Sequence, residues 1–146
     1  MRSIRKVKIL GYPFAGGQGK CGVELTPGWL NDQAWFKDLS AASNGNITYE
    51  EIKVSASHSN LKNVSEEEAN RPAHVPKNIE NVLRSSMMLR AQTYAALKEG
   101  YYPVVLGGDH SQAIGSIAGL KKMYPDAKLL WLDAHIDANT PETSPS

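Results

Sequence analysis

The sequence predicts an α/β fold, in which a parallel sheet carries helices on both of its faces. Two observations support this prediction: apolar runs of strand length at residues 102–106 and 128–132, and a helical pattern that separates them. Continuous apolar strands are typical of parallel sheets buried on both faces, and alternating strands and helices build such sheets. A chain of 146 residues suits a single domain, so we treat residues 1–146 as one unit.

The first third of the chain predicts a strand, a loop and a helix. Residues 7–11 form a short strand, and a glycine-rich loop follows it. Thr26 followed by Pro27 indicates a helix start, with Thr26 as the N-cap and Pro27 at the first helical position. We expect this helix to continue through Phe36.

The middle of the chain combines a strand, an irregular segment and a long helix. Residues 47–52 follow a turn-forming Ser-Asn-Gly-Asn sequence and predict the second strand. Residues 55–77 are polar, contain prolines and show no sustained period, so we read them as a surface excursion. From Asn78 we expect a helix that ends at Gly100 as its C′ residue. Its expected core face is one apolar stripe formed by Ile79, Val82, Leu83, Met87, Tyr94 and Leu97.

The last third runs in the order strand, helix, strand. The apolar run of residues 102–106 changes abruptly into Gly-Gly-Asp-His-Ser at residues 107–111. The helix expected at residues 112–123 stops before a proline. Residues 128–132 predict the next strand, which runs directly into Asp-Ala-His-Ile-Asp at residues 133–137.

Composition excludes several classes of function. The formal net charge of +1 provides no long-range field for nucleic acid or an acidic membrane, so we expect neither partner. Cys21 is the only cysteine, which excludes an internal disulfide and a Cys-rich zinc site. No stretch approaches the roughly 20 apolar residues that span a bilayer, and the basic start lacks the pattern of a signal or transit peptide. We therefore expect a cytoplasmic protein.

Acidic and histidine residues follow two of the predicted strands at the points where those strands end. His110 follows the first strand and Asp133 the second, with a spacing that fits one short helix and two loops. In a right-handed βαβ unit both strand ends lie on one edge of the sheet, where open α/β sheets bind ligands. Asp109, His110, Asp133, His135 and Asp137 should therefore gather in one place.

The alternation of Asp133, His135 and Asp137 points to a metal site. An extended backbone projects all three side chains to one side. Two carboxylates and an imidazole crowded together are costly to desolvate, and a divalent cation compensates for that cost. A carboxylate-rich shell with few imidazoles suits Mn²⁺ or a similar ion better than a structural zinc. Paired ions generate a strong nucleophile from water at neutral pH, so we infer metal-assisted hydrolysis.

These residues also have interpretations other than a metal site. An Asp-x-His pair can be an ordinary turn pairing, although here two separate strand ends deliver such residues to one edge. Asp109 is expected to bond the loop or orient His110 rather than to bind metal. His58 and His74 lie in the irregular segment, and we expect both to be solvated.

Residues 17–22 match the dinucleotide-binding pattern G-x-G-x-x-G. The match begins several residues after the strand, whereas the fingerprint opens the turn directly, and the next helix starts too late to face a pyrophosphate. A phosphate-binding P-loop fails because Phe14 and Cys21 occupy positions that need glycine and Ser/Thr. NAD binding, followed by fluorescence, separates this interpretation from the metal site.

The two polar segments resemble the first two signature motifs of the ureohydrolase family. These are Gly-Gly-Asp-His-Ser at residues 107–111 and Asp-Ala-His-Ile-Asp at residues 133–137. The following Ala-Asn-Thr-Pro at residues 138–141 is similar to arginases in particular, as are residues 11–14 and 22–24. The resemblance implies an arginase/deacetylase-like three-layer fold. It also implies a homotrimer whose subunits use two Mn²⁺ each to hydrolyse L-arginine to L-ornithine and urea.

Matched position by position, the resemblance also implies roles for individual residues. His110, Asp133 and Asp137 would hold one manganese, and His135 with the shared Asp133 would hold the other. His135 and Asp137 are in addition the predicted catalytic residues. The predicted substrate-binding residues are Asn139, at the amino-acid end of the substrate, and Ser146, at its carboxylate.

Part of the family's pattern is absent from these 146 residues. The missing third motif, Ser-x-Asp-x-Asp-x-x-Asp-Pro, supplies two further metal carboxylates, and the acidic residues that grip the substrate are missing as well. We therefore expect the chain to be a truncated, N-terminal part of a single arginase-like domain, with little or no activity alone. The alternative is a non-catalytic interaction module that associates with full-length subunits.

Overall fold

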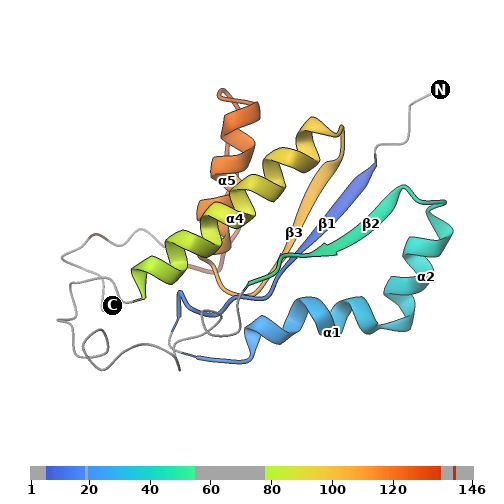
Figure 1. Cartoon of the computed structure of the whole chain (residues 1–146), viewed down its shortest axis with the longest axis horizontal. Helices are drawn as coiled ribbons and strands as arrows, with labels where there is room; N and C mark the ends of the chain where they lie inside the picture. The colour runs from blue at the N-terminus through green and yellow to red at the C-terminus, as the bar shows by residue number, and fades with distance from the viewer. Residues whose placement is uncertain (1–5, 19, 55–77, 136–139, 141–146) are drawn as a thin grey trace.

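A computed structural model describes residues 6–18, 20–54, 78–135 and 140 of the chain (Figure 1). Its sheet has three parallel strands in the order β2–β1–β3. The central strand β1 (Val7–Tyr12) pairs with β2 (Ile47–Glu51) on one side and with β3 (Tyr102–Gly107) on the other. These three strands begin and end within one residue of their predicted positions. The fourth predicted strand, at residues 128–132, is not formed.

The helices lie on both faces of this sheet, as the sequence predicts (Figure 1). The short 3₁₀ helix η1 (Val23–Leu25) leads into α1 (Thr26–Asp32), and α2 (Ala34–Ala42) follows on the same side. On the other side α4 (Ile79–Lys98) crosses β1 and β3, and α5 (Gln112–Met123) packs against α4. None of the described helices is both long enough and apolar enough to cross a membrane.

The strand order positions the candidate site. From β1 the chain moves outward to β2 and then returns across β1 to reach β3 on the far side. The chain continues from β1 to α1 on one face of the sheet and from β3 to α5 on the other, and doubly wound sheets bind ligands at the strand ends where the connections change face. The register pairs Tyr12 with Gly107, so both strands end at the same level and their loops lie side by side.

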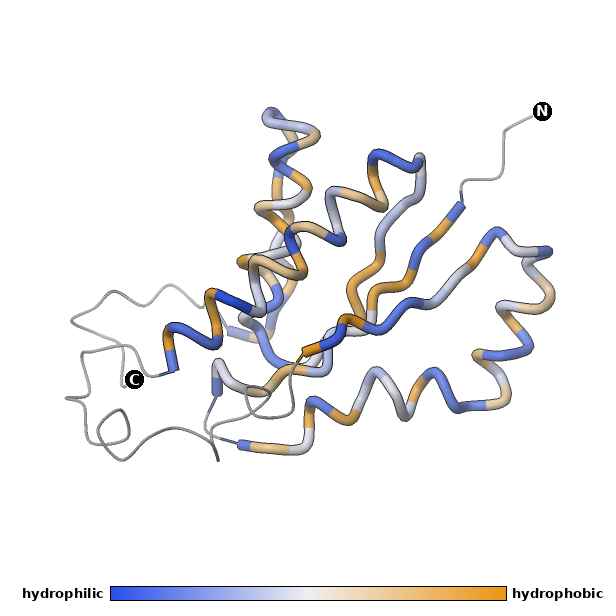
Figure 2. The backbone as a smooth tube through the Cα atoms, in the orientation of Figure 1, coloured by the Kyte–Doolittle hydropathy of each residue, from blue (hydrophilic) through white to orange (hydrophobic). Residues whose placement is uncertain are grey.

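The hydrophobic core lies next to the ends of β1 and β2. Apolar residues follow one another in the middle of β1 and of β3, whereas the helices alternate apolar and polar residues (Figure 2). Burial of such apolar surface is the dominant favourable term in folding. The core cluster consists of Leu10, Tyr12, Phe14, Ile52 and Leu89.

The buried side of α4 differs from the predicted stripe. Ile79, Leu83 and Met87 are 40%, 51% and 67% exposed. The reason is a close approach of α5, whose Gly115 and Gly119 lie so near the α4 backbone that a Cβ would come within 2.5 Å and 2.7 Å of its carbonyl oxygens. Close packing therefore selects the small side of α4, where the buried residues are Ser85, Ser86, Leu89, Thr93 and Ala96.

The helix predicted to start at Thr26 is two helices. Gln33 takes an extended conformation (φ −67°, ψ 140°) and separates α1 from α2, while Leu25, not Thr26, occupies the N-cap. The break reorients the chain so that the buried Phe36 ring meets Tyr49 of β2 edge-to-face, with centroids 6.0 Å apart. This packing overrides the continuous helical pattern of the sequence. Gly100, in contrast, ends α4 with φ 81° as predicted.

The strand predicted at residues 128–132 is wrong for the described part of the chain. These residues take no regular structure, and among the described strands β3 pairs only with β1. Leu130 and Leu132 are 79% and 85% exposed. An apolar run becomes a parallel strand when other elements cover both of its faces, and the described residues supply no such cover. The irregular segment predicted at residues 55–77 lies outside the described residues.

Candidate metal centre

The loops that follow β1 and β3 are joined by backbone hydrogen bonds beyond the ends of the strands. The N–H of Gly108 donates to the carbonyl of Tyr12 at 3.0 Å, and the N–H of Asp109 donates to the carbonyl of Phe14 at 2.9 Å. A Cβ on Gly108 would lie 1.9 Å from the Phe14 oxygen. Only glycine allows this approach. The second glycine of the Gly-Gly-Asp-His sequence therefore leaves the space in which these hydrogen bonds join the two loops.

Asp109 is the buried anchor of this junction, with 4% of its surface exposed. One carboxylate oxygen accepts the N–H of Gly17 at 2.7 Å. The other accepts the N–H of Ser111 at 3.0 Å and the Ser111 hydroxyl at 2.5 Å. Three donors thus stabilise the buried carboxylate. As expected from the sequence, Asp109 bonds the loop that carries His110.

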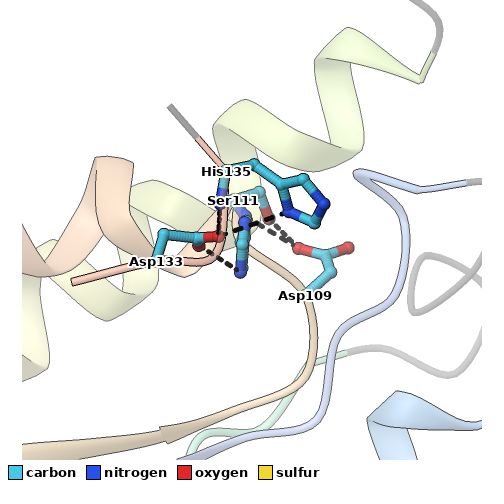
Figure 3. Close-up of polar contacts among 5 residues, drawn as sticks. Asp109, Ser111, Asp133 and His135 are labelled. Carbon is cyan, nitrogen blue, oxygen red and sulfur yellow. Dashed lines mark hydrogen bonds and ion pairs between the residues drawn. The ribbon is translucent and has the colours of Figure 1, made fainter. Parts of the chain in front are cut away.

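His110, Asp133 and His135 come together in front of this anchor. The Asp133 Oδ2 atom lies 3.6 Å from Nε2 of His110, and its Oδ1 atom lies 3.5 Å from Nδ1 of His135. Figure 3 shows these contacts beside the bonds between Asp109 and Ser111. The structure therefore brings together side chains from two segments, and each carboxylate oxygen of Asp133 faces a different imidazole.

These separations suit shared ions better than direct hydrogen bonds. Nitrogen and oxygen atoms in a hydrogen bond lie about 2.7–3.2 Å apart. Two ligand atoms about 2.1 Å from one metal ion, at a tetrahedral angle, lie about 3.4 Å apart. Within the described residues no three acidic, histidine or cysteine side chains surround a single ion position. The arrangement instead offers one imidazole and one carboxylate oxygen at each of two positions.

The electrostatics keep Asp133 in its charged form. The backbone N–H of His135 donates to Oδ1 at 2.9 Å and holds the pKa of Asp133 below its ordinary value, and the two imidazoles add to this effect. The Asp133 side chain is 14% exposed, whereas those of His110 and His135 are 70% and 83% exposed. A charged carboxylate between two accessible imidazoles is a donor set that a divalent cation can use.

A cleft of about 320 Å³ opens beside this group. Trp131 forms part of its wall and meets the His110 ring edge-to-face, with centroids 6.1 Å apart. A larger cavity of about 540 Å³ lies near the opposite end of β3, where Tyr101 and Tyr102 line it. Among the described residues no acidic or histidine side chain lines that cavity, so its size does not make it the better candidate for hydrolytic chemistry.

Some predicted site residues lie outside the described residues: Asp137, Asn139 and Ser146. Their roles stay predictions. The sequence reasoning missed Gly17, whose N–H bonds Asp109 from 92 positions away. In a dinucleotide fingerprint this loop would offer its N–H groups to a phosphate, but here the Gly17 N–H is bonded to Asp109. The Asp-x-Ser spacing of an Asx turn was the local signal for Ser111.

The chain is similar to a protein-family model and to known proteins. The model described as the arginase family matches residues 5–146. Among curated relatives, the arginase of Staphylococcus aureus (strain COL) is 30% identical over the whole chain and 46% of its own length. Arginase-1 of Rattus norvegicus is 36% identical over 97% of the chain and 41% of its own length. The chain therefore spans less than half the length of these relatives.

Solved structures have the same fold. The arginase of Bacillus caldovelox superposes with a TM-score of 0.78 at 30% identity, over 97% of this chain and 45% of that one. The Entamoeba histolytica arginase in complex with L-ornithine superposes with a TM-score of 0.64 at 28% identity, over 99% of this chain and 46% of that one. The likeness extends over almost all of the present chain.

Proposed function

Because the chain belongs to the arginase family, we propose that it carries part of the metal site of an arginase-type hydrolase. The proposed reaction converts L-arginine and water to L-ornithine and urea, with Mn²⁺ as the cofactor. An arginase among the solved relatives contains L-ornithine, which is the product this reaction would release. In a complete subunit we expect two Mn²⁺ and assembly into a homotrimer.

One observation carries the proposal: Asp133 directs one oxygen to the imidazole of His110 and the other to that of His135. A carboxylate in this position can bridge two ions, which is what a binuclear hydrolase requires. The imidazoles come from different segments, so Asp133 would hold an ion with each of them only where the loop after β3 and residues 133–135 meet. Asp137 is proposed as a further ligand of the ion on the His110 side.

The residues of the chain divide the chemistry as follows. A bound pair of divalent ions lowers the pKa of water and so supplies a nucleophile at neutral pH. Asp133, held ionised by the His135 N–H, contributes negative charge between the two imidazoles. His110 and His135 contribute imidazole nitrogen donors. Asn139 and Ser146 are proposed to contact the amino-acid end of L-arginine.

The charge balance predicts weak binding. Two divalent ions carry four positive charges, and Asp133 with Asp137 offsets two of them. The two further metal carboxylates of the family's third motif do not occur in this sequence. We therefore propose that this chain binds Mn²⁺ weakly and releases urea from L-arginine slowly or not at all when it is alone.

Manganese titration followed by electron paramagnetic resonance tests the proposal, together with a urea assay at saturating Mn²⁺. His110→Ala and Asp133→Ala should each abolish the bound-Mn²⁺ signal. Asp126→Ala, which removes a carboxylate seven positions before Asp133, is the matched control and should leave the signal unchanged. The metal assignment is wrong if the alanine variants bind Mn²⁺ as well as the native chain does. Turnover near that of an intact arginase would contradict the expected weak activity.

A second role is favoured by a separate observation. The apolar residues 129–132 are exposed, and Val104 of β3 is 40% exposed. Among the described strands β3 pairs only with β1, and an unpaired apolar strand edge promotes association. We propose association with longer arginase-family subunits as this alternative role. Co-expression with a full-length arginase followed by affinity purification tests it. Recovery of the full-length subunit alone, at every ratio of the two chains, would exclude this role.

A further inference from the structure

We propose that Asn78 is a positioning residue for the His110 loop, acting through the Gly16–Gly17 peptide group on the carboxylate of Asp109. Asn78 lies at the start of α4, on a different element from every predicted ligand. The structural part of the proposal stands on hydrogen bonds and burial alone. Its consequence for manganese binding rests on the function proposed above.

The Gly16–Gly17 peptide group is held from both of its ends. The side-chain Nδ2 of Asn78 donates to the carbonyl oxygen of Gly16 at 3.0 Å. The N–H of the same peptide group, on Gly17, donates to Oδ2 of Asp109 at 2.7 Å. Hydrogen bonds in series polarise one another, so the Asn78 bond strengthens the Gly17 bond to Asp109. No side-chain contact between Asn78 and Asp109 is needed for this coupling.

The side chain of Asn78 bonds this peptide group instead of capping its own helix. Asn78 is fully buried and takes a left-handed conformation, with φ 55° and ψ 27°. It is the N-cap of α4, yet its side chain makes no capping hydrogen bond, although asparagine is among the best capping residues. The amide of Asn81 donates to Oδ1 of Asn78, which leaves Nδ2 directed at Gly16.

The space around Gly16 makes the contact specific. A Cβ on Gly16 would lie 2.5 Å from Nδ2 of Asn78 and 2.4 Å from the Phe14 ring. The loop after β1 is therefore pressed against Asn78 with no room for a side chain. A shift of this loop would carry the Gly17 N–H with it and leave the buried Asp109 with one donor fewer.

Asp109 in turn restrains the backbone of His110, its neighbour in sequence. Asp109 bonds both donors of Ser111, and the carbonyl of His110 accepts the N–H of Ala113 in the first turn of α5. The backbone of His110 is thus fixed from both sides. Loss of the Gly17 bond would loosen the first of these restraints, and the imidazole of His110 would move relative to Asp133.

Two variants of Asn78 and one control separate the effect of its Nδ2 hydrogen-bond donor from the effect of its side-chain shape. Asn78→Asp keeps the shape and the tolerance of the left-handed region, but it places an oxygen where Nδ2 faces the Gly16 carbonyl. Asn78→Gly keeps the backbone conformation and removes the side chain. Asn44→Gly is the control, because Asn44 is the other described non-glycine residue with positive φ (52°) and it is exposed. If shape alone matters, Asp should perform better than Gly.

The first measurement needs no metal. In ¹⁵N-labelled protein, Asn78→Asp should shift the Gly17 amide resonance and raise its hydrogen-exchange rate by about tenfold or more. The imidazole resonances of His110 should shift as well, and Asn78→Gly should give smaller changes of the same kind. Asn44→Gly should change none of these signals. The proposal is overturned if the Gly17 amide and the His110 ring are unaffected in the Asn78 variants.

The second measurement is Mn²⁺ affinity by paramagnetic resonance. Loss of a residue that orients a ligand typically weakens metal binding about 10- to 100-fold, and we expect a loss in this range for Asn78→Asp with unchanged circular dichroism. If Asn78→Asp fails to fold, Asn78→Gly and the milder Asn81→Ala are measured in its place. Equal Mn²⁺ affinity in folded variants overturns the effect on the metal. Failure of the native chain to bind Mn²⁺ would overturn the proposed function and leave the amide measurements as the test of Asn78.

Discussion

The two segments that form the candidate site are held by different forces. The loop that carries His110 is bonded through Gly108 and Asp109 to the loop after β1, and Asp109 is buried with three donors. Residues 129–132, which lead to Asp133, are 43–85% exposed and take no regular structure. One segment therefore has its geometry set by the described fold, whereas the other meets that fold through contacts with His110, made by the carboxylate of Asp133 and the ring of Trp131.

This difference indicates where the site is preorganised. Binding sites work best when neighbouring residues hold the ligands in place. The His110 side meets this condition, because the buried carboxylate of Asp109 next to it accepts three hydrogen bonds. The Asp133 side does not, so a bound ion would itself have to help order it.

The largest effect is expected for Gly108→Ala. The new Cβ would lie 1.9 Å from the Phe14 carbonyl oxygen, so the joined loops would have to separate at a cost of about 4 kcal/mol or more. Urea denaturation measures the loss. Gly28→Ala in α1 is the control, because the nearest atom to its Cβ is 3.6 Å away and alanine favours the helix by about 0.5–1 kcal/mol. Equal stability of the two variants would contradict the close approach.

Asp109→Ala should come next. It leaves the N–H groups of Gly17 and Ser111 without their acceptor and should lower the free energy of unfolding by about 3 kcal/mol. Asp133→Ala is the matched change in the other segment, and we expect it to leave the unfolding midpoint unchanged while Mn²⁺ binding is lost. A midpoint that falls equally in both variants would remove the distinction between the two segments.

The dependence of stability on alkaline pH provides a third test. It concerns only the segment with buried contacts, to which Tyr12 belongs. Burial raises the pKa of Tyr12 to about 12 from an ordinary value of 10.0, and the nearby hydroxyls of Ser111, Ser85 and Ser86 only partly oppose this. The pKa of Tyr12 is higher in the folded than in the unfolded chain. The neutral Tyr12 hydroxyl therefore contributes its full share to the free energy of unfolding below pH 10, and this share is lost as the pH rises through about 12. Two pKa units correspond to about 3 kcal/mol.

Stability measured from pH 9 to 12 should therefore fall in the native chain and fall less in Tyr12→Phe. The hydroxyl of Tyr12 is buried and makes no hydrogen bond of normal geometry with the described residues. Tyr12→Phe should accordingly fold well at neutral pH. Parallel stability curves for the two proteins across this range would show that another group causes the alkaline loss.

The smallest effect is expected for Leu130→Ser. Leu130 is 79% exposed, so its replacement should change the free energy of unfolding by less than about 0.5 kcal/mol. Leu89→Ala is the buried counterpart in the core and should cost about 2–5 kcal/mol. A large loss for Leu130→Ser would mean that residues 129–132 are covered in solution, for example by another chain, and that the two segments differ less than the exposed areas indicate.

Much of the fold could be predicted from local patterns. The bounds of α5, the stop at Gly100 and the three described strands follow from apolar runs and from residues that end helices. The proximity of His110 and Asp133 was also predicted, on the premise of two parallel strands joined by a helix, and it holds although residues 128–132 take no regular structure. These features depend on neighbours a few positions away or on the handedness of one connection.

The sequence by itself determined the class of fold, the order of the three described strands and the approach of His110 to Asp133. Only the tertiary structure decided which side of α4 is buried, where the helix after Pro27 breaks, and how the Gly16–Gly17 peptide group links Asn78 to Asp109. Those two bonds join residues 62 and 92 positions apart. Contacts over such distances depend on how helices and loops pack, and no local period or stop signal encodes that packing.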